Sequence, residues 1–314
     1  MKRDVLAVLL SAAAFWAATA GAAAPDAALK NGPNKERLVL DDMEDVSDWG
    51  NGSPEETTIS ADAQYVKEGR LSLKFANLVD HTRGEKNYPV GWPRTRKALS
   101  KTGPTDWSGY DFFECWIYAG TSRPSLPGTP LGIGFYHSGP KRSTGVSLDD
   151  VKKDSWAKIV IPIAEMEEAA DVQAVQFHIS EANYRHGDRV DFFIDEMVLT
   201  RFIHPVIAGF EPRRKLLYQN DRHVMATYAL MGRQGMDGVT VRLAIAADGQ
   251  SPVAQSTAAA SREGELTLAI DKPLEPGDYQ ATLALHRRGR DGAPGEELDR
   301  RQTAFRVIEG PFER

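Results

Sequence analysis

Side chains of the kinds that bind sugars recur on three stretches of the chain. The stretches WPRTRK, GIGFYHS and VQFHIS cover residues 92–97, 132–138 and 175–180. Aromatic rings contact the C–H faces of pyranose rings, and Arg, Gln and His side chains hydrogen-bond to hydroxyl groups. The candidate ligand-binding residues are Trp92, Arg94, Arg96, Tyr136, Gln176 and His178, with Tyr184 in the adjoining loop. Two arginines in this set would also suit an acidic polysaccharide.

Period-2 alternation predicts how these side chains are positioned. Val175, Phe177 and Ile179 alternate with polar residues, as expected of a half-buried strand. Consecutive strands of a jelly roll tend to alternate between its two sheets. We therefore expect the three stretches to share one sheet and to turn the candidate residues to one face of it. The alternative is a solvated sheet face without a ligand.

The stretch FECWIY, residues 113–118, should then lie in the other sheet. Glu114, Trp116 and Tyr118 share one side of it. Aromatic side chains on an outer face need cover. We expect this face to pack against a second domain, with a second ligand site as the alternative.

Acidic residues near the start and end of the same region indicate a metal site. Asp42 and Glu44 share one face of the first predicted strand, and Asp195 lies in a mostly apolar run. A carboxylate in an apolar strand needs a partner. Together with backbone carbonyls near Gly69, the three would suit a structural calcium ion, whose ligands are oxygens. The alternative is a set of surface acids and turn caps.

Composition limits the classes of partner. The chain has 314 residues, 26% of them charged, with a net charge of −6 and no basic block. This disfavours nucleic acid and anionic membrane surfaces as partners. The single cysteine, Cys115, cannot form an internal disulfide. Residues 1–23 have a basic start, an apolar core and small residues near Ala20 and Ala23, which predicts a cleaved signal peptide and a secreted or periplasmic protein. No later stretch is long and apolar enough to span a membrane.

Frequent turn residues and scarce helical periodicity predict an all-β chain. About eight strands in residues 38–202 are typical of a two-sheet jelly roll. Five clearly alternating runs in residues 207–310 predict a second unit, an immunoglobulin- or fibronectin-like β-sandwich without the cysteine pair of antibody domains. The expected fold is therefore a jelly-roll β-sandwich followed by a smaller β-sandwich.

A series of segments within residues 38–202 resembles the galactose-binding-like jelly rolls, most closely the family eleven carbohydrate-binding modules. The segments, in chain order, are LDDMEDVSDWG, EGRLSLKFAN, DWSGYDFFECWIYAG, SWAKIVIPI, VQAVQFHISEAN and VDFFIDEMVL. The resemblance implies a β-glucan or related polysaccharide in a concave cleft, and a structural calcium at the acidic first strand and Asp195. The chain departs from the family in that cleft, where it has Arg94, Arg96, Gln176 and His178 instead of several tyrosines and acids.

Two other functions are compatible with the sequence. Gln176-Phe177-His178 is similar to the Gln-x-His signature of jelly-roll alginate lyases, and Arg94 and Tyr136 could complete a quartet that acts on uronate-containing glycans. The family's downstream Tyr-Lys motif is missing. The third hypothesis is an exported structural protein whose aromatic face binds another protein. The prediction we adopt is an exported, non-catalytic polysaccharide-binding protein.

Overall fold

A computed structural model describes most of the chain. It covers residues 34–83, 91–99, 103–139, 142–232, 235–247, 250–289 and 294–310. The predicted signal peptide, residues 1–23, lies outside the described residues. Within the described ranges, no helix is long and apolar enough to cross a membrane.

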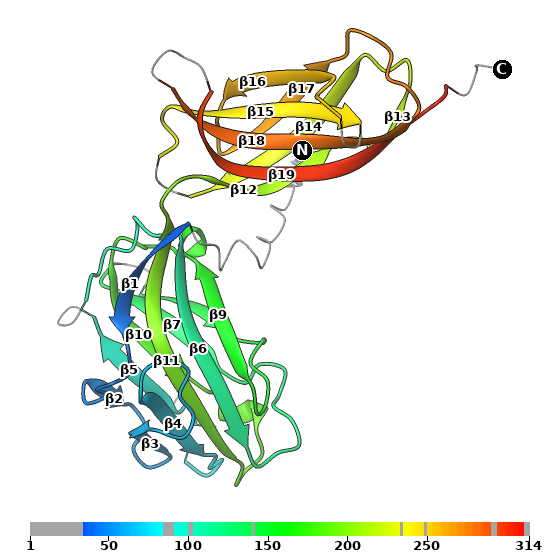
Figure 1. Ribbon diagram of the computed structural model, residues 1–314. Helices are drawn as coiled ribbons and strands as arrows, with labels where there is room; N and C mark the ends of the chain where they lie inside the picture. The colour runs from blue at the N-terminus through cyan, green and yellow to red at the C-terminus, as the bar shows by residue number, and fades with distance from the viewer. Residues whose placement is uncertain are drawn as a thin grey trace, which may run out of the picture.

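The first unit is a β-sandwich, the lower of the two bodies in Figure 1. Its strands are β1 (Lys35–Asp41), β2 (Trp49–Asn51), β3 (Thr57–Asp62), β4 (Ser72–Leu78), β5 (Arg94–Ala98), β6 (Phe112–Thr121), β7 (Gly132–His137), β8 (Ser143–Ser147), β9 (Trp156–Pro162), β10 (Val172–His178) and β11 (Arg189–Phe202), with two short 3-10 helices, η1 (Ile163–Glu165) and η2 (Glu181–Asn183). One sheet has the order β3-β4-β11-β6-β9, with β1 also paired to β11. The other has the order β2-β5-β10-β7-β8. The predicted division of strands is confirmed, since β5, β7 and β10 share the second sheet and β6 lies in the first.

Alternation along the strands builds the core between the two sheets. Val175 and Phe177 of β10 are fully buried, as are Phe75 of β4 and Ile117 of β6. They belong to one hydrophobic cluster that spans both sheets. Cys115 lies in the same cluster, and burial raises the pKa of its thiol. This packing fixes which side of each strand faces out.

Strand β11 is interrupted at Asp195. Along one edge it pairs with β4 before this residue and with β1 after it. Residues 189–194 pair with β4, whereas residues 197–202 pair with β1. The register shifts between Asp195 and Val198, and Glu196 has a φ of 54°. A β-bulge of this kind re-aims side chains locally. The first and last strands of the sandwich are therefore neighbours, and Asp195 lies at the bulge.

The second unit is a smaller β-sandwich. Its strands are β12 (Val206–Pro212), β13 (Leu216–Tyr218), β14 (His223–Met231), β15 (Val239–Ala247), β16 (Ala254–Ala259), β17 (Glu263–Ala269), β18 (Gly277–Arg288) and β19 (Pro294–Ile308). A three-stranded sheet, β12-β14-β17, faces a five-stranded sheet, β13-β19-β18-β15-β16. The interior has its own hydrophobic cluster. The predicted fold class, an all-β jelly roll followed by a second β-sandwich, is confirmed.

A small apolar cluster joins the two sandwiches where β11 passes into β12 (Figure 1). Phe112, Phe202 and Val206 are buried there, with Met231 packed against them. The expectation that Glu114, Trp116 and Tyr118 pack against the second sandwich is wrong; the Glu114 carboxylate, for example, contacts Lys35, Lys158 and Thr200 of the first sandwich.

The first sandwich covers those side chains itself. The Lys67 ammonium lies 4.1 Å from the centre of the Trp116 ring. The Tyr65 ring stacks on Tyr118 with 4.4 Å between ring centres. The long loop between β3 and β4 thus places its own residues over these rings.

Candidate functional site

Five of the seven predicted ligand-binding residues, Arg94, Arg96, Tyr136, Gln176 and His178, lie on strands of the β2-β5-β10-β7-β8 sheet and on its outer face. In the register of this sheet, His178 pairs with Arg94 on one side and with Gly132 on the other. Gln176 pairs in the same way with Arg96 and Gly134. The intervening residues, such as Phe177, are buried in the core. The strand alternation therefore brings these polar side chains to one face, as the sequence pattern predicted.

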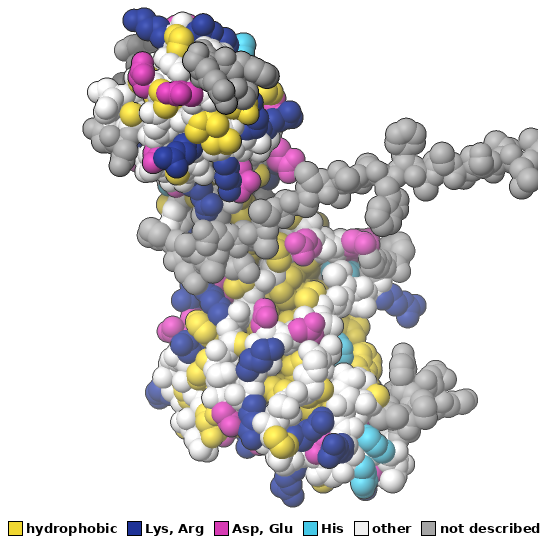
Figure 2. All heavy atoms as spheres, turned by 90° about the vertical axis from the view of Figure 1, so that its right-hand side faces the viewer, with side chains coloured by type: hydrophobic (Ala, Val, Ile, Leu, Met, Phe, Trp, Pro, Cys, Tyr) yellow, Lys and Arg dark blue, Asp and Glu magenta, His cyan; other side chains and the backbone are white. Residues whose placement is uncertain are grey.

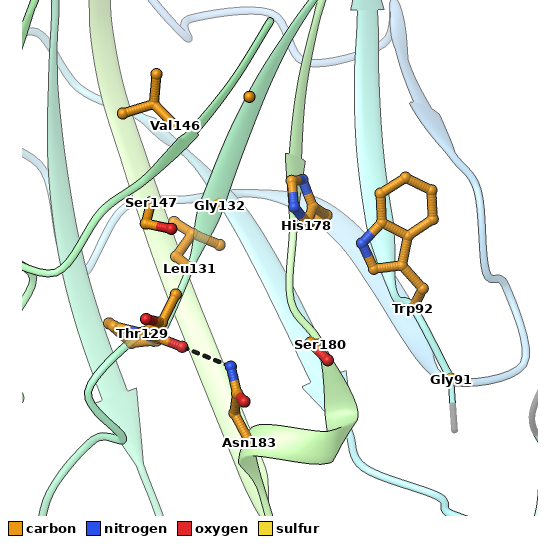
Figure 3. A pocket seen from close by; sticks show the side chains of 12 residues that line it. Gly91, Trp92, Thr129, Leu131, Gly132, Val146, Ser147, His178, Ser180 and Asn183 are labelled. Atoms are coloured by element: carbon orange, nitrogen blue, oxygen red, sulfur yellow. Dashed lines mark hydrogen bonds between the residues drawn. The ribbon is translucent and has the colours of Figure 1, made fainter. Parts of the chain in front are cut away.

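A pocket of about 410 Å³ lies at one end of this face (Figure 3). Its lining residues are Gly91, Trp92, Thr129, Pro130, Leu131, Gly132, Gly145, Val146, Ser147, His178, Ser180 and Asn183. The Trp92 ring meets the His178 ring edge-on, with 5.0 Å between ring centres. Asn183 donates its side-chain N–H to the Thr129 carbonyl oxygen at 3.0 Å. The pocket thus combines an aromatic wall with hydroxyl and amide groups.

Glycines make room for the His178 imidazole. A Cβ added at Gly132 would lie 2.4 Å from His178 Nε2, so the ring lies directly over this glycine. A Cβ at Gly145, which also lines the pocket, would meet no atom. Glycine inside a strand often marks a close approach of another group. The GIG pattern at 132–134 is the signal in the sequence that points to this pocket.

A second cluster lies beside the pocket on the same face. The Arg96 guanidinium carbon is 4.4 Å from the centre of the Tyr136 ring. The Arg94 guanidinium carbon is 5.1 Å from the Trp92 ring centre, and Arg94 Nη1 donates to the Trp92 carbonyl oxygen. Gln176 is only 4% exposed, and its Nε2 atom is buried without a hydrogen-bond partner. Leaving a buried donor unpaired costs about 1–3 kcal/mol.

Burial keeps His178 neutral. Desolvation lowers the pKa of its imidazole to about 4, and its Nδ1 atom is buried without a partner. At neutral pH this side chain is therefore uncharged, and its Nδ1 atom lacks a hydrogen-bond partner among the described residues. It is also a weak base, because a general base works best with a pKa near the operating pH.

Tyr184 does not belong to this face, which corrects the sequence-based prediction. It is only 4% exposed and lies in the hydrophobic core. Its hydroxyl donates to the Pro130 carbonyl oxygen at 2.7 Å. The turn formed by η2 directs the ring inward, because the Tyr184 N–H closes that turn on the Glu181 carbonyl oxygen. The hydroxyl therefore anchors the loop at the pocket wall and contacts no ligand.

Two buried carboxylates that the sequence did not predict lie behind the pocket. Glu181 is fully buried; its oxygens accept the N–H groups of Asp80 at 2.8 Å and Gly91 at 3.0 Å. Glu56 is 9% exposed and points to the same place, since a Cβ on Gly91 would contact both carboxylates. Desolvation first, and then the charges of Glu181 and Asp80, raise the pKa of Glu56 to about 7. Glu181 thus holds the backbone that presents Trp92.

The three predicted metal ligands do not form a ready-made cluster. Among the described residues, no group of three His, Cys, Asp or Glu side chains could hold a metal ion. Asp42 is exposed and accepts the N–H of Glu44 within a turn. Glu44 accepts the N–H groups of Arg70 and Leu71. Asp42 therefore acts as a turn cap, which was the alternative hypothesis for this residue.

Asp195 differs from the other two because one of its oxygens is unused. The side chain is fully buried, and Oδ2 accepts the N–H groups of Lys67 at 2.7 Å and Glu68 at 3.0 Å. Oδ1 is buried without a hydrogen-bond partner. Desolvation raises the pKa of Asp195, and the charges of Glu68 and Glu44 add to this rise. Asp195 is therefore the one predicted ligand with a buried oxygen that lacks a partner among the described residues.

Comparison with known proteins gives likenesses of fold only. No protein-family model matches the chain, and no curated protein sequence matches it. One similar solved structure is the CBM27-1 module from Caldicellulosiruptor saccharolyticus in complex with mannohexaose. The alignment covers 52% of this chain and 96% of the module's chain, with 11% identity and a TM-score of 0.35. The CBM22-1 xylan-binding domain of Xyn10C from Paenibacillus barcinonensis covers 53% and 95%, with 10% identity and a TM-score of 0.33.

A β-glucuronidase from Ruminococcus gnavus in complex with D-glucuronic acid covers 88% of this chain and 46% of its own, with 11% identity and a TM-score of 0.27. At identities and TM-scores this low, none of these structures supports an argument about ligand or activity. The assignment of two β-sandwiches rests on the sheet topology described above. The more specific resemblance to family eleven modules stays a prediction.

Proposed function

We propose that the first sandwich binds a polysaccharide, without catalysis, on the outer face of the β2-β5-β10-β7-β8 sheet. The observation that carries this proposal is the pocket in which the Trp92 ring stands against the neutral His178 ring, beside Ser147, Ser180 and Asn183. An aromatic wall with a few polar groups is the usual composition of a small-molecule site. Sugar rings have the matching surface, with apolar C–H faces and hydroxyl edges.

The polar atoms of this face favour a ligand rich in hydrogen-bond acceptors. Gln176 Nε2 has donors without an acceptor, and Arg96 is exposed beside Tyr136. A hydroxyl or uronate oxygen that reaches Gln176 would recover part of the cost of its unpaired donor. The face therefore suits a neutral or uronate-containing glycan, in agreement with the two arginines noted in the sequence.

The lyase hypothesis has weaker support in the geometry. Gln176 and His178 share the face with Arg94 and Tyr136, as that hypothesis requires. Tyr136, however, pairs with Ala174, four residues along β10 from His178, which separates their backbones by roughly 13 Å. The lowered pKa of His178 also makes it a poor proton acceptor at neutral pH.

A panel of soluble neutral and uronate-containing polysaccharides in native affinity gels tests the proposal. We expect retardation by at least one of them, with no rise in the ultraviolet absorbance of unsaturated uronates. Such a rise, abolished in His178→Ala, would establish the lyase instead. If every polysaccharide leaves mobility unchanged while a protein partner co-purifies, the third hypothesis, a protein-binding aromatic face, replaces both.

We also propose a structural calcium ion at Asp195, with Glu44 as a further ligand. The buried, unpartnered Oδ1 of Asp195 supports it. Chelation should lower the melting temperature and added calcium should restore it, since a ligand at a hundred times its Kd stabilises by about 2.7 kcal/mol. Thermal unfolding with and without chelator measures this.

The variant Asp195→Asn separates the two possibilities by the sign of its effect. With a bound ion, it should destabilise the protein and abolish the response to calcium. Without one, it should stabilise the protein, because it removes an uncompensated buried charge. A melting temperature that calcium and chelator both leave unchanged would remove the calcium proposal. Export remains a prediction from residues 1–23.

A further inference from the structure

A basic pocket in the second sandwich has no role in the proposed function. It has a volume of about 480 Å³ and lies beside β13, between the loop that precedes this strand and the turn that follows it. Its lining residues are Arg213, Arg214, Leu217, Asp221, Arg222, His223, Val224 and Met225. Figure 2, which has the second sandwich at the top, shows Lys and Arg side chains around hydrophobic ones on its visible face. The chain as a whole carries a charge of −6, so this local concentration of cations stands apart.

Backbone hydrogen bonds hold the basic residues in place. The Arg213 N–H donates to the Met225 carbonyl oxygen at 2.9 Å, and the Arg306 N–H donates to the Lys215 carbonyl oxygen at 2.9 Å. The Tyr218 N–H donates to the Asp221 carboxylate at 2.8 Å, which closes the turn. The loop and the turn are thus tied to the sheets, and the guanidinium groups project from a fixed frame.

The guanidinium groups keep most of their donors for a ligand. Arg213 contacts Glu265 at 2.6 Å and Arg214 contacts Asp221 at 3.0 Å. Each guanidinium has five N–H donors in a planar fork, so these ion pairs orient the groups without using all of them. The Arg222 guanidinium makes no ion pair or hydrogen bond within the described part of the chain. Three arginines and two acidic residues, Asp221 and Glu265, thus lie at this pocket.

Apolar side chains line the floor of the pocket, and others are exposed on the adjoining strand β13. Leu217 and Val224 are buried beneath the pocket, whereas Leu216 is 48% exposed and Tyr218 is 40% exposed on β13. A planar Arg fork matches a carboxylate or sulfate, and an exposed Tyr offers a face to a sugar ring. An acidic polysaccharide matches this combination, because its carboxylate or sulfate groups are spaced along the chain and its sugar rings have apolar faces. A denser polyanion such as single-stranded nucleic acid would bring more phosphate against Asp221 and Glu265.

We propose that this pocket, formed around Arg213, Arg214 and Arg222, is a second binding site, for the carboxylate or sulfate groups of an acidic polysaccharide. It is independent of the pocket at Trp92 and gives the second sandwich a binding role. Because its charged groups are solvent-exposed, its affinity should fall as ionic strength rises.

Affinity electrophoresis in gels that contain polygalacturonate tests the site, with the whole chain carrying Trp92→Ala to remove the contribution of the first pocket. We expect this chain to be retarded at low ionic strength. Arg222→Gln, which breaks no existing ion pair, should weaken binding roughly tenfold, the value of one charged hydrogen bond. Arg262→Gln, an exposed arginine outside the pocket, is the matched control and should change nothing.

Three results would overturn this proposal. They are the absence of retardation in the Trp92→Ala chain, equal binding by the Arg222→Gln and control variants, and tighter Arg222-dependent binding to single-stranded DNA than to polygalacturonate. Binding of neutral glycans at the first pocket is measured separately, so failure here leaves the proposed function of the first sandwich intact.

Discussion

Replacing Asp41 with alanine should lower the free energy of unfolding of the first sandwich by about 3–5 kcal/mol. Asp41 is 6% exposed and accepts hydrogen bonds from Lys97 Nζ at 2.6 Å, Trp49 Nε1 at 2.9 Å and the Met43 N–H at 2.8 Å. Lys97 is 5% exposed and has one other acid, Asp48, at 2.9 Å. Removal of Asp41 leaves the buried Lys97 charge with only the partly exposed Asp48 as a partner, which is more costly than loss of a surface ion pair.

Urea unfolding followed by tryptophan fluorescence measures this effect. All tryptophans after residue 23 lie between Trp49 and Trp156, so the signal reports on the first sandwich alone. Asp150→Ala, at an exposed acid, is the control and should stay within about 0.5 kcal/mol of the wild type. Equal midpoints for the two variants would show that the Asp41–Lys97 pair does not stabilise the sandwich.

The second large effect is a loss of stability as the pH rises through about 7, caused by Glu56. Its pKa is raised to about 7 from an ordinary value of 4.5, chiefly by burial and then by the charges of Glu181 and Asp80. The folded state therefore binds more protons than the unfolded state between these two values, and its stability falls as pH rises. The contribution of Glu56 to the free energy of unfolding is fully present below pH 4.5, its pKa in the unfolded chain, and is lost above about pH 7. The loss is on the order of 2–3 kcal/mol.

The groups that face Glu56 make the comparison of variants essential. Glu181 and Asp80 lie against it, Arg83 acts on it at longer range, and the His81 ring contacts the Glu181 carbonyl oxygen. The His186 ring lies near Asp80, at 3.5 Å. Because several ionisable groups surround Glu56, the wild-type curve alone does not isolate its contribution.

Glu56→Gln isolates it, because the amide imitates the protonated acid and can donate to Glu181. Fluorescence-detected unfolding should show the variant to be more stable than the wild type at pH 8 and close to it at pH 4. The exposed Glu55→Gln should follow the wild type at every pH. If Glu56→Gln instead keeps the wild-type dependence, the two carboxylates do not share a proton. Affinity for the ligand should also fall as the pH rises through about 7. Glu181, whose charge acts on Glu56, accepts the Gly91 N–H next to Trp92 and so holds the backbone at the pocket.

Strand alternation was sufficient to predict which side chains share the outer face of this sheet. Val175 and Phe177 had to lie inside, so Gln176 and His178 had to lie outside, and the jelly-roll alternation of strands brought Arg94 and Tyr136 to the same sheet. These are short-range rules, in which each residue's side is set by its neighbours on the strand.

Features that depend on contacts between distant segments were not predictable in this way. Asp41 and Asp42 are adjacent acids, and only packing against Lys97 decides which of them is buried. Glu56 and Glu181 are far apart in the chain, yet both carboxylates lie close to Gly91 in the folded protein. Tyr184 appeared available because it sits in a polar loop, yet the η2 turn directs it inward. The bulge that re-aims Asp195 likewise depends on the junction of β1 and β4 along β11.

The measurement that tests the central claim most directly is the affinity of Trp92→Ala for the neutral or uronate-containing polysaccharide that best retards the wild type. Trp156→Ala is the matched control, because Trp156 lies on β9 of the other sheet and contacts Tyr118. Isothermal titration calorimetry should show binding weakened roughly thirtyfold by Trp92→Ala, equivalent to about 2 kcal/mol, and unchanged by Trp156→Ala. Wild-type affinity in Trp92→Ala, or a loss confined to Trp156→Ala, would contradict the proposed binding face.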